Sequence, residues 1–130
     1  MAERLVIADT DLIIDFLRGA DPGATQVAGW IEDRRLRVTA VTAFELRLGT
    51  DFLGRQNEIE ALLQRRALPL DALGALHAGR IFVALRAEGR GIDVKDALQA
   101  GVCLRFQLPL ATRNIRHFGR VPDLELETGA

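Results

Sequence analysis

Three carboxylates and an amide stand where an α/β fold would gather them. Asp9 closes the apolar run at residues 5–8, which has the character of a buried strand, and Asn114 closely follows a later run of the same kind. Glu45 and Asp96 each fall near the start of a segment with helical spacing. Carboxylates held together at the end of a buried strand are costly unless a cation joins them. The pattern therefore predicts a divalent metal site.

Each helical acid also has a local explanation as a capping residue. Asp11 stands where an N-cap is expected, and Thr42-x-x-Glu45 matches a capping box. Asp96 comes three residues after the potential cap Asp93, where a helix dipole favours an acid. Capping explains each acid singly. It does not explain why all of them would project from the same end of a parallel sheet.

Short apolar runs alternate with amphipathic segments along the chain. Strands are predicted at residues 5–9, 36–40, 68–70 and 108–112, with a candidate fifth at 124–126. Helices are predicted at 12–18, at 25–34 with Thr25 as the cap, from 42 onward, and at 58–66, 71–88 and 93–106. This order indicates an α/β protein with a three-layer α/β/α arrangement and a central, mainly parallel sheet of four to five strands. The ligand crevice of such a sheet lies beyond the carboxyl ends of its strands.

Size and composition favour one globular domain over residues 1–130. Hydrophobic residues make up 48% of the chain and charged residues 27%, which is unlike a disordered segment. The net charge of −1 argues against a generally basic nucleic-acid binder, so a polyanion would have to meet local cations. The candidates near the predicted site are Arg18, Arg47, Arg113, Arg116 and His117. No apolar run is long enough to span a membrane, so a soluble, cytoplasmic protein is expected.

Three stretches in order resemble a known family. "ADTDLIIDFLRG" contains Asp9, "VTAFELRLG" contains Glu45, and "GIDVKDALQAGVCLRFQLPLATRNIRHF" contains Asp96 and Asn114. Together they resemble a PIN-domain ribonuclease of the VapC type, the toxin half of a bacterial toxin–antitoxin pair. The family often has aspartate at the fourth position, where this chain has Asn114, and a small polar residue where it has Asp11.

The resemblance implies an endoribonuclease that depends on Mg²⁺ or Mn²⁺. Asp9, Glu45 and Asp96 are expected to hold one or two ions directly or through water, with Asn114 as a weak ligand or a residue that orients water. Thr10, Asp11 and Thr112 are expected to support the acids. Hard oxygen ligands, with Cys103 as the one cysteine, favour these ions over Zn²⁺. Such an ion activates water for attack on a phosphodiester.

The resemblance also implies partners. VapC-type proteins form homodimers and are blocked by a cognate antitoxin that covers the acidic groove. Leu12, Phe16 and Trp30 could serve such interfaces, although burial in the core is the commoner use of apolar residues.

Three other functions fit parts of the pattern. A haloacid-dehalogenase-type phosphatase would use an aspartate after the first strand, but it also needs a supporting lysine, and Lys95 adjoins Asp96 instead. A receiver-type signalling domain would need a phosphoacceptor after a central strand and a lysine after a late one, where this chain has Arg113. A PIN domain that only binds RNA or protein, with Asn114 marking lost catalysis, is the third alternative.

Overall fold

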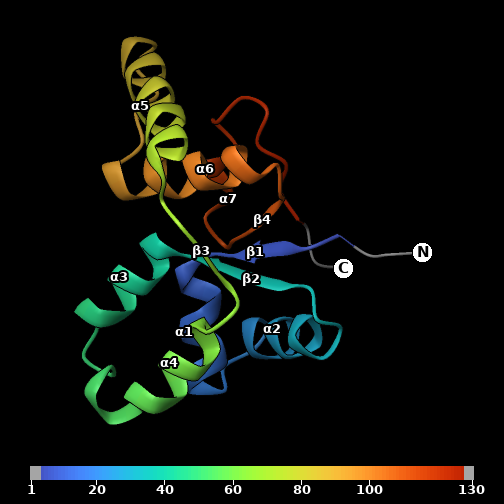
Figure 1. Cartoon of the computed structure of the whole chain (residues 1–130). Coiled ribbons are helices and arrows are strands. Elements are labelled where there is room, and N and C mark those ends of the chain that lie inside the picture. Colours follow the sequence, from blue (N-terminus) through green and yellow to red (C-terminus); the bar gives the residue numbers. More distant parts are fainter. Residues whose placement is uncertain (1–3, 128–130) are drawn as a thin grey trace.

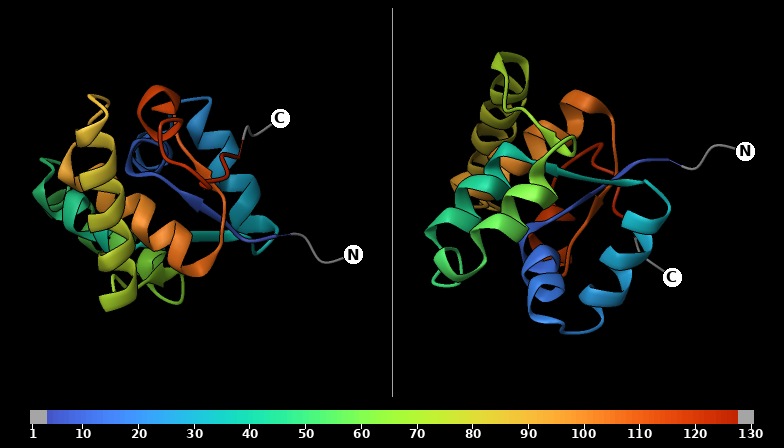
Figure 2. Two further views of the ribbon diagram at one scale, coloured as in Figure 1. Left: turned by 90° about the horizontal axis from the view of Figure 1, so that it is seen from above. Right: turned by 60° about the horizontal axis from the view of Figure 1, so that its bottom comes forward.

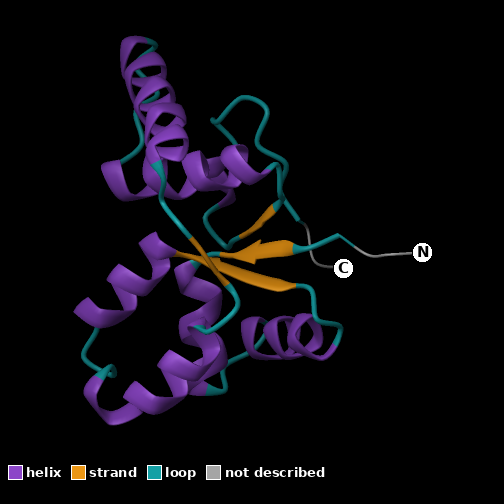
Figure 3. Cartoon of the chain, viewed as in Figure 1, coloured by secondary structure: helices purple, strands orange, loops and turns teal. Residues whose placement is uncertain are grey.

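A four-stranded parallel sheet organises the chain. The computed structural model describes residues 4–127, so residues 1–3 and 128–130 of the predicted domain lie outside the described part. The strands are β1 (Val6–Ala8), β2 (Leu36–Thr39), β3 (Ala67–Leu68) and β4 (Leu110–Ala111), in the spatial order β3-β2-β1-β4. The helices are α1 (Thr10–Arg18), α2 (Gly23–Glu32), α3 (Ala40–Leu48), α4 (Gln56–Leu63), α5 (Ala72–Ala87), α6 (Val94–Phe106) and α7 (Ile115–Phe118), with a 3-10 turn η1 (Leu53–Arg55). The sheet runs between the helices (Figure 1, Figure 3).

Helices cover both faces of the sheet, as the alternation of elements predicts. Val6 and Ala8 pack into a core with α1, α2, α3 and α4, whereas Ile7 between them packs with α5, α6 and α7 (Figure 1). Successive strand residues point to opposite faces, so one short strand contributes to both cores. This confirms the predicted three-layer α/β/α fold.

The helix α6, which carries Asp96, is fixed by close contact with α5. A Cβ atom added at Gly101 would clash with the carbonyl oxygen of Gly74 and would lie 2.8 Å from the Cβ of Ala78. The missing side chain therefore lets the two backbones approach, and α5 and α6 lie side by side in all views (Figure 1, Figure 2). Asp71, the N-cap of α5, also pairs with Arg105 of α6 at 2.8 Å.

Several predicted boundaries differ from the structure. Helix α2 begins at Gly23, and Thr25 is not its cap, because both the amide and the hydroxyl of Thr25 donate to the Asp21 carboxylate. Helix α1 begins at Thr10, so Asp9 takes the N-cap position that was predicted for Asp11. The candidate fifth strand is a single bridge between Leu126 and Leu110.

The side chains considered as interface or thiol candidates lie mostly inside. Leu12 and Trp30 are buried in the core, Phe16 is half-buried against it, and Cys103 is fully buried. Burial raises the pKa of the Cys103 thiol, as expected for a packed cysteine. Among residues 4–127, no helix combines the length and the apolar character that crossing a bilayer requires.

Candidate metal centre

Three strand ends meet at one edge of the sheet. The register pairs Ile7 with Leu110 and Ala8 with Ala111, so Asp9 and Thr112 are the next residues on adjacent strands. Because β2 lies on the other side of β1 in parallel, Thr39 ends at the same edge. The predicted convergence of strand-end polar residues is therefore present in the fold.

Asp9 is the buried carboxylate of this edge. Its exposed fraction is 9%, and its two oxygens accept hydrogen bonds from Gln99 Nε2 at 3.0 Å and from Thr112 Oγ1 at 2.7 Å. Burial raises the pKa of Asp9 to about 6, the nearby charge of Asp11 adds to the rise, and the two hydrogen bonds oppose it. A carboxylate in this state gains from a nearby cation.

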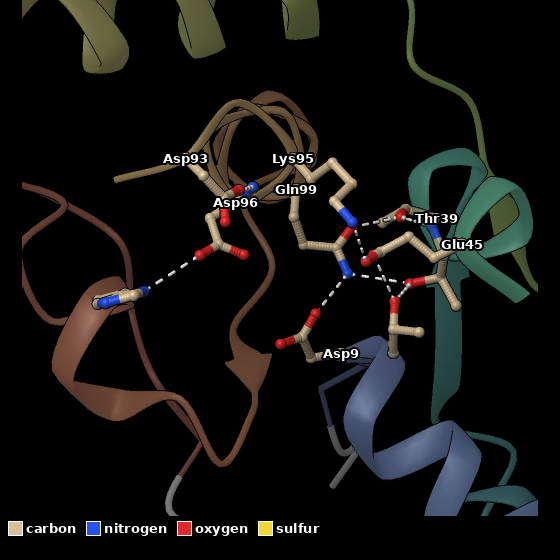
Figure 4. Close-up of polar contacts among 10 residues, drawn as sticks. Asp9, Thr39, Glu45, Asp93, Lys95, Asp96 and Gln99 are labelled. Atoms are coloured by element: carbon tan, nitrogen blue, oxygen red, sulfur yellow. Dashed lines mark hydrogen bonds and ion pairs between the residues drawn. The ribbon is translucent and has the colours of Figure 1, made fainter. Parts of the chain in front are cut away.

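Gln99 is a functional residue that the sequence reasoning missed. It is buried on α6, and its amide nitrogen donates to Asp9 Oδ1 and to Thr42 Oγ1, each at 3.0 Å. Its amide oxygen accepts from the Thr39 hydroxyl. Figure 4 shows Gln99 between Asp9 on one side and Thr39 and Glu45 on the other. Its spacing of three residues from Asp96 places both on one helix face, and this was the signal that could have found it.

Glu45 is held by a chain of hydroxyl groups. Thr10 Oγ1 donates to Glu45 Oε1 at 2.7 Å. Since Thr10 has one hydroxyl proton, the 2.9 Å contact between the Thr10 and Thr42 hydroxyls must use the proton of Thr42. Gln99 donates to Thr42 in turn, so one directed chain of hydrogen bonds links Gln99 with Glu45. The other Glu45 oxygen lies 3.6 Å from Lys95 Nζ.

The capping-box explanation of Glu45 is wrong. The N-cap of α3 is Thr39, whose Oγ1 accepts from the amide of Thr42 at 3.1 Å. Strand β2 runs straight into α3, so the helix begins earlier than Thr42 and Glu45 lies in its second turn. The side chain of Glu45 points to Thr10 and Lys95 instead of its own helix terminus.

Asp96 projects from the first turn of α6. Asp93 caps this helix as predicted, by accepting from the Asp96 amide at 3.1 Å. Partial burial raises the pKa of Asp96, the charge of Asp93 adds to the rise, and contact with His117 opposes it. Asp96 Oδ2 lies 3.4 Å from His117 Nδ1, and that nitrogen lies 3.1 Å from Asn114 Nδ2.

Asp11 supports the loop after β4. Its Oδ2 accepts from the Arg113 amide at 3.0 Å, and Asn114 N donates to Thr112 Oγ1, so both ends of this turn are fixed. The other oxygen, Asp11 Oδ1, is buried and has no hydrogen-bond partner. The guanidinium of Arg113 lies 3.1 Å from Oδ2 of the buried Asp15. Arg113 is therefore committed to α1.

The remaining cationic candidates differ in availability. Arg18 pairs with Asp51 at 2.9 Å, and the guanidinium of Arg47 lies 4.9 Å from the centre of the Phe52 ring. Arg116 is exposed and has no ion pair or hydrogen bond within residues 4–127. Of these three, Arg116 is the cation most free to meet a polyanion.

The donor set fits a hard divalent cation. Asp9, Glu45, Asp96 and Asn114 offer oxygen ligands, and Asp9 keeps lone pairs on both oxygens beyond the hydrogen bonds it accepts. No three histidine, cysteine, aspartate or glutamate side chains within residues 4–127 are close enough to enclose an ion. This open arrangement suits Mg²⁺, which keeps several of its waters and binds few carboxylates directly.

Comparison with known proteins identifies the family. Residues 6–124 match the PIN domain, which is nearly the whole described chain. The chain belongs to the PIN-domain family. Two curated relatives support the VapC group: ribonuclease VapC19 of Mycobacterium tuberculosis is 31% identical over 124 residues, covering 92% of this chain and 96% of that protein. Ribonuclease VapC3 of Methanocaldococcus jannaschii is 31% identical over 96 residues, covering 74% of this chain and 95% of that protein.

Solved structures share the fold of this PIN domain. DNA-bound VapBC from Salmonella typhimurium superposes with a TM-score of 0.82 at 23% identity, covering 96% of this chain and 98% of that chain. VapBC2 of Rickettsia felis, bound to a promoter DNA fragment, gives 0.78 at 18% identity over 95% and 97% of the two chains. At these identities the likeness concerns the fold, and it agrees with the parallel sheet found here.

Proposed function

We propose that this PIN domain is an endoribonuclease that requires Mg²⁺ or Mn²⁺ and is the toxin of a toxin–antitoxin pair. The observation that carries the proposal is the buried Asp9 carboxylate at the sheet edge, with Asp96 and Glu45 on either side of Gln99 (Figure 4). The two relatives named as VapC ribonucleases support RNA as the substrate.

The side chains would divide the work as follows. A bound divalent ion supplies an activated water and neutralises charge on the phosphodiester. Asp9, Asp96 and Glu45 would hold the ion, and Asn114 would orient water near it. Gln99 and Thr112 fix the Asp9 oxygens before substrate arrives, so little side-chain freedom is lost when the reaction begins.

RNA would approach across the exposed side of this edge. Arg116 is unpaired and follows Asn114 by two residues, so it is the best-placed candidate for a phosphate contact. Arg18 and Arg113 would each have to leave an acidic partner first. Lys95, half exposed beside Glu45, adds a second cation at the site itself.

The test uses two aspartates of one helix start. Asp96→Asn is expected to reduce RNA cleavage on the order of 100-fold or more, because it removes a carboxylate from the reacting centre. Asp93→Asn is the matched control, since asparagine caps a helix as well as aspartate does. Cleavage that survives EDTA would contradict the metal requirement. RNA that is bound but not cut, with metal present, would favour the binding-only alternative.

The biological role has separate tests. A toxin of this kind is expected to act on cytoplasmic RNA, to form a homodimer, and to lose activity in a complex with an antitoxin encoded beside it. Sedimentation measures the dimer, and titrating the neighbouring gene product into a cleavage assay measures the inhibition. Phe44 and Leu48, exposed on α3 near Glu45, are candidate contacts for that partner.

A further inference from the structure

The ring nitrogen Nδ1 of His117 faces two partners whose demands conflict. Asn114 Nδ2, a donor, lies 3.1 Å away and needs an unprotonated Nδ1. Asp96 Oδ2, an acceptor, lies 3.4 Å away and needs a proton on the same nitrogen. One nitrogen cannot satisfy both, so these three side chains leave at least one contact unmet in any state of the protein alone.

A cation in this place removes the conflict. The lone pair of His117 Nδ1 and the Asp96 oxygen can both point at a positive ion. A half-turn of the Asn114 amide would present its oxygen in place of its nitrogen. The separations of 3.1 and 3.4 Å are close to the ~3.0 Å between neighbouring ligands of an octahedral ion with bonds of about 2.1 Å. The atoms are thus spaced as ligands of one ion.

We propose that His117 is a metal ligand, so that the ion beside Asp96 is bound by nitrogen as well as oxygen. The inference rests on the proposed function only in assuming that a divalent ion binds at these acids. An imidazole ligand favours transition-metal ions over Mg²⁺, which prefers oxygen. The centre therefore prefers Mn²⁺ to Mg²⁺, by an amount that depends on His117.

Position and exposure of His117 agree with this role. It lies on the short helix α7, which follows β4 at the same sheet edge as Asp9, and its side chain is 40% exposed. An ion can thus reach it from solvent, and its replacement should not unfold the protein. The second histidine of the chain, His77, lies on α5 near Arg80 and serves as a matched control.

The test is pulsed electron paramagnetic resonance of Mn²⁺ bound to the purified protein. Coupling to a directly bonded ¹⁴N nucleus is expected in the wild type and in His77→Gln, and it should vanish in His117→Gln. Because the chain has two histidines, the comparison assigns the nitrogen without ambiguity. Mn²⁺ affinity should fall about tenfold or more in His117→Gln, and Mg²⁺ affinity should change less.

The outcomes separate this inference from the proposed function. Mn²⁺ that binds the wild type, is lost in Asp96→Asn and shows no ¹⁴N coupling would overturn the role of His117 and leave the metal site standing. Coupling that persists in His117→Gln would overturn it too. No Mn²⁺ binding to the folded wild type would overturn both proposals. Circular dichroism of each variant verifies that it is folded.

Discussion

Gln99 Nε2 donates to Asp9 Oδ1 at 3.0 Å, and this bond joins two buried side chains that are ninety residues apart. The same amide binds Thr39 and Thr42, so Gln99 is satisfied on both its oxygen and its nitrogen. One residue of α6 therefore connects the ends of β1 and β2 and the start of α3.

Gln99→Met is expected to destabilise the protein by about 2–4 kcal/mol, because it leaves buried polar partners unmatched at similar volume. Urea unfolding measures this change. Gln56→Met, at an exposed glutamine of α4, is the control and should change stability by no more than about 0.5 kcal/mol. Equal effects of the two substitutions would contradict the role of Gln99.

Asp9 predicts how stability depends on pH in EDTA. Its folded pKa of about 6 exceeds its ordinary value of 3.8, so the folded protein binds this proton more tightly than the unfolded chain. The wild type should therefore lose stability relative to Asp9→Asn as pH rises from about 4 to 6, by up to about 3 kcal/mol. Outside this window the difference should stay constant. Urea unfolding of both proteins at each pH measures it, and parallel stability curves would contradict the raised pKa.

Gly101→Ala is expected to destabilise the protein by about 1–3 kcal/mol, since the new methyl group meets Gly74 and Ala78 of α5. Gly79→Ala is the control: its added Cβ has nothing within 4 Å, so the better helix propensity of alanine should stabilise by up to about 1 kcal/mol. Thermal unfolding compares them. Opposite signs at two helical glycines would establish the close packing of α5 on α6.

Arg113 and Arg116 carry the same charge in the same loop but should respond differently. Arg113→Ala leaves the buried Asp15 without its ion pair, and a loss of about 1–2 kcal/mol is expected because Arg113 itself is half exposed. Arg116→Ala should leave stability unchanged and weaken RNA binding, with the largest effect at low salt. Denaturation and RNA titration measure the two effects, and the reverse result would contradict the assignment.

The sequence was sufficient to predict the architecture because each strand is a short apolar run and each helix has a buried stripe. Asp9 was predictable for the same reason: it is the first polar residue after β1. The predicted roles of Asp9, Glu45, Asp96 and Asn114 in metal binding and catalysis remain predictions, since the fold places these residues without testing them.

The errors have local physical causes. Thr39 and Thr42 are both good caps, and only the direct passage from β2 to α3 selects the first. Gln99 has no distinctive pattern, because a polar residue on a helix is usually solvated, and its burial follows from the packing of α6 against the sheet edge. His117 was considered as an RNA contact, and its contact with Asp96 depends on the turn after β4.

The direct passage from β2 to α3 also limits how this protein can vary. No residue separates Thr39 of the strand from Ala40 of the helix. One inserted residue would turn the helix about 100° around its axis and advance it by about 1.5 Å, which would carry Glu45 away from Thr10 and Lys95. Insertions in the chain between α3 and α4, at residues 49–52, would leave this geometry intact. The tolerance of the chain to changes in length should therefore be lowest at a junction where no loop is visible.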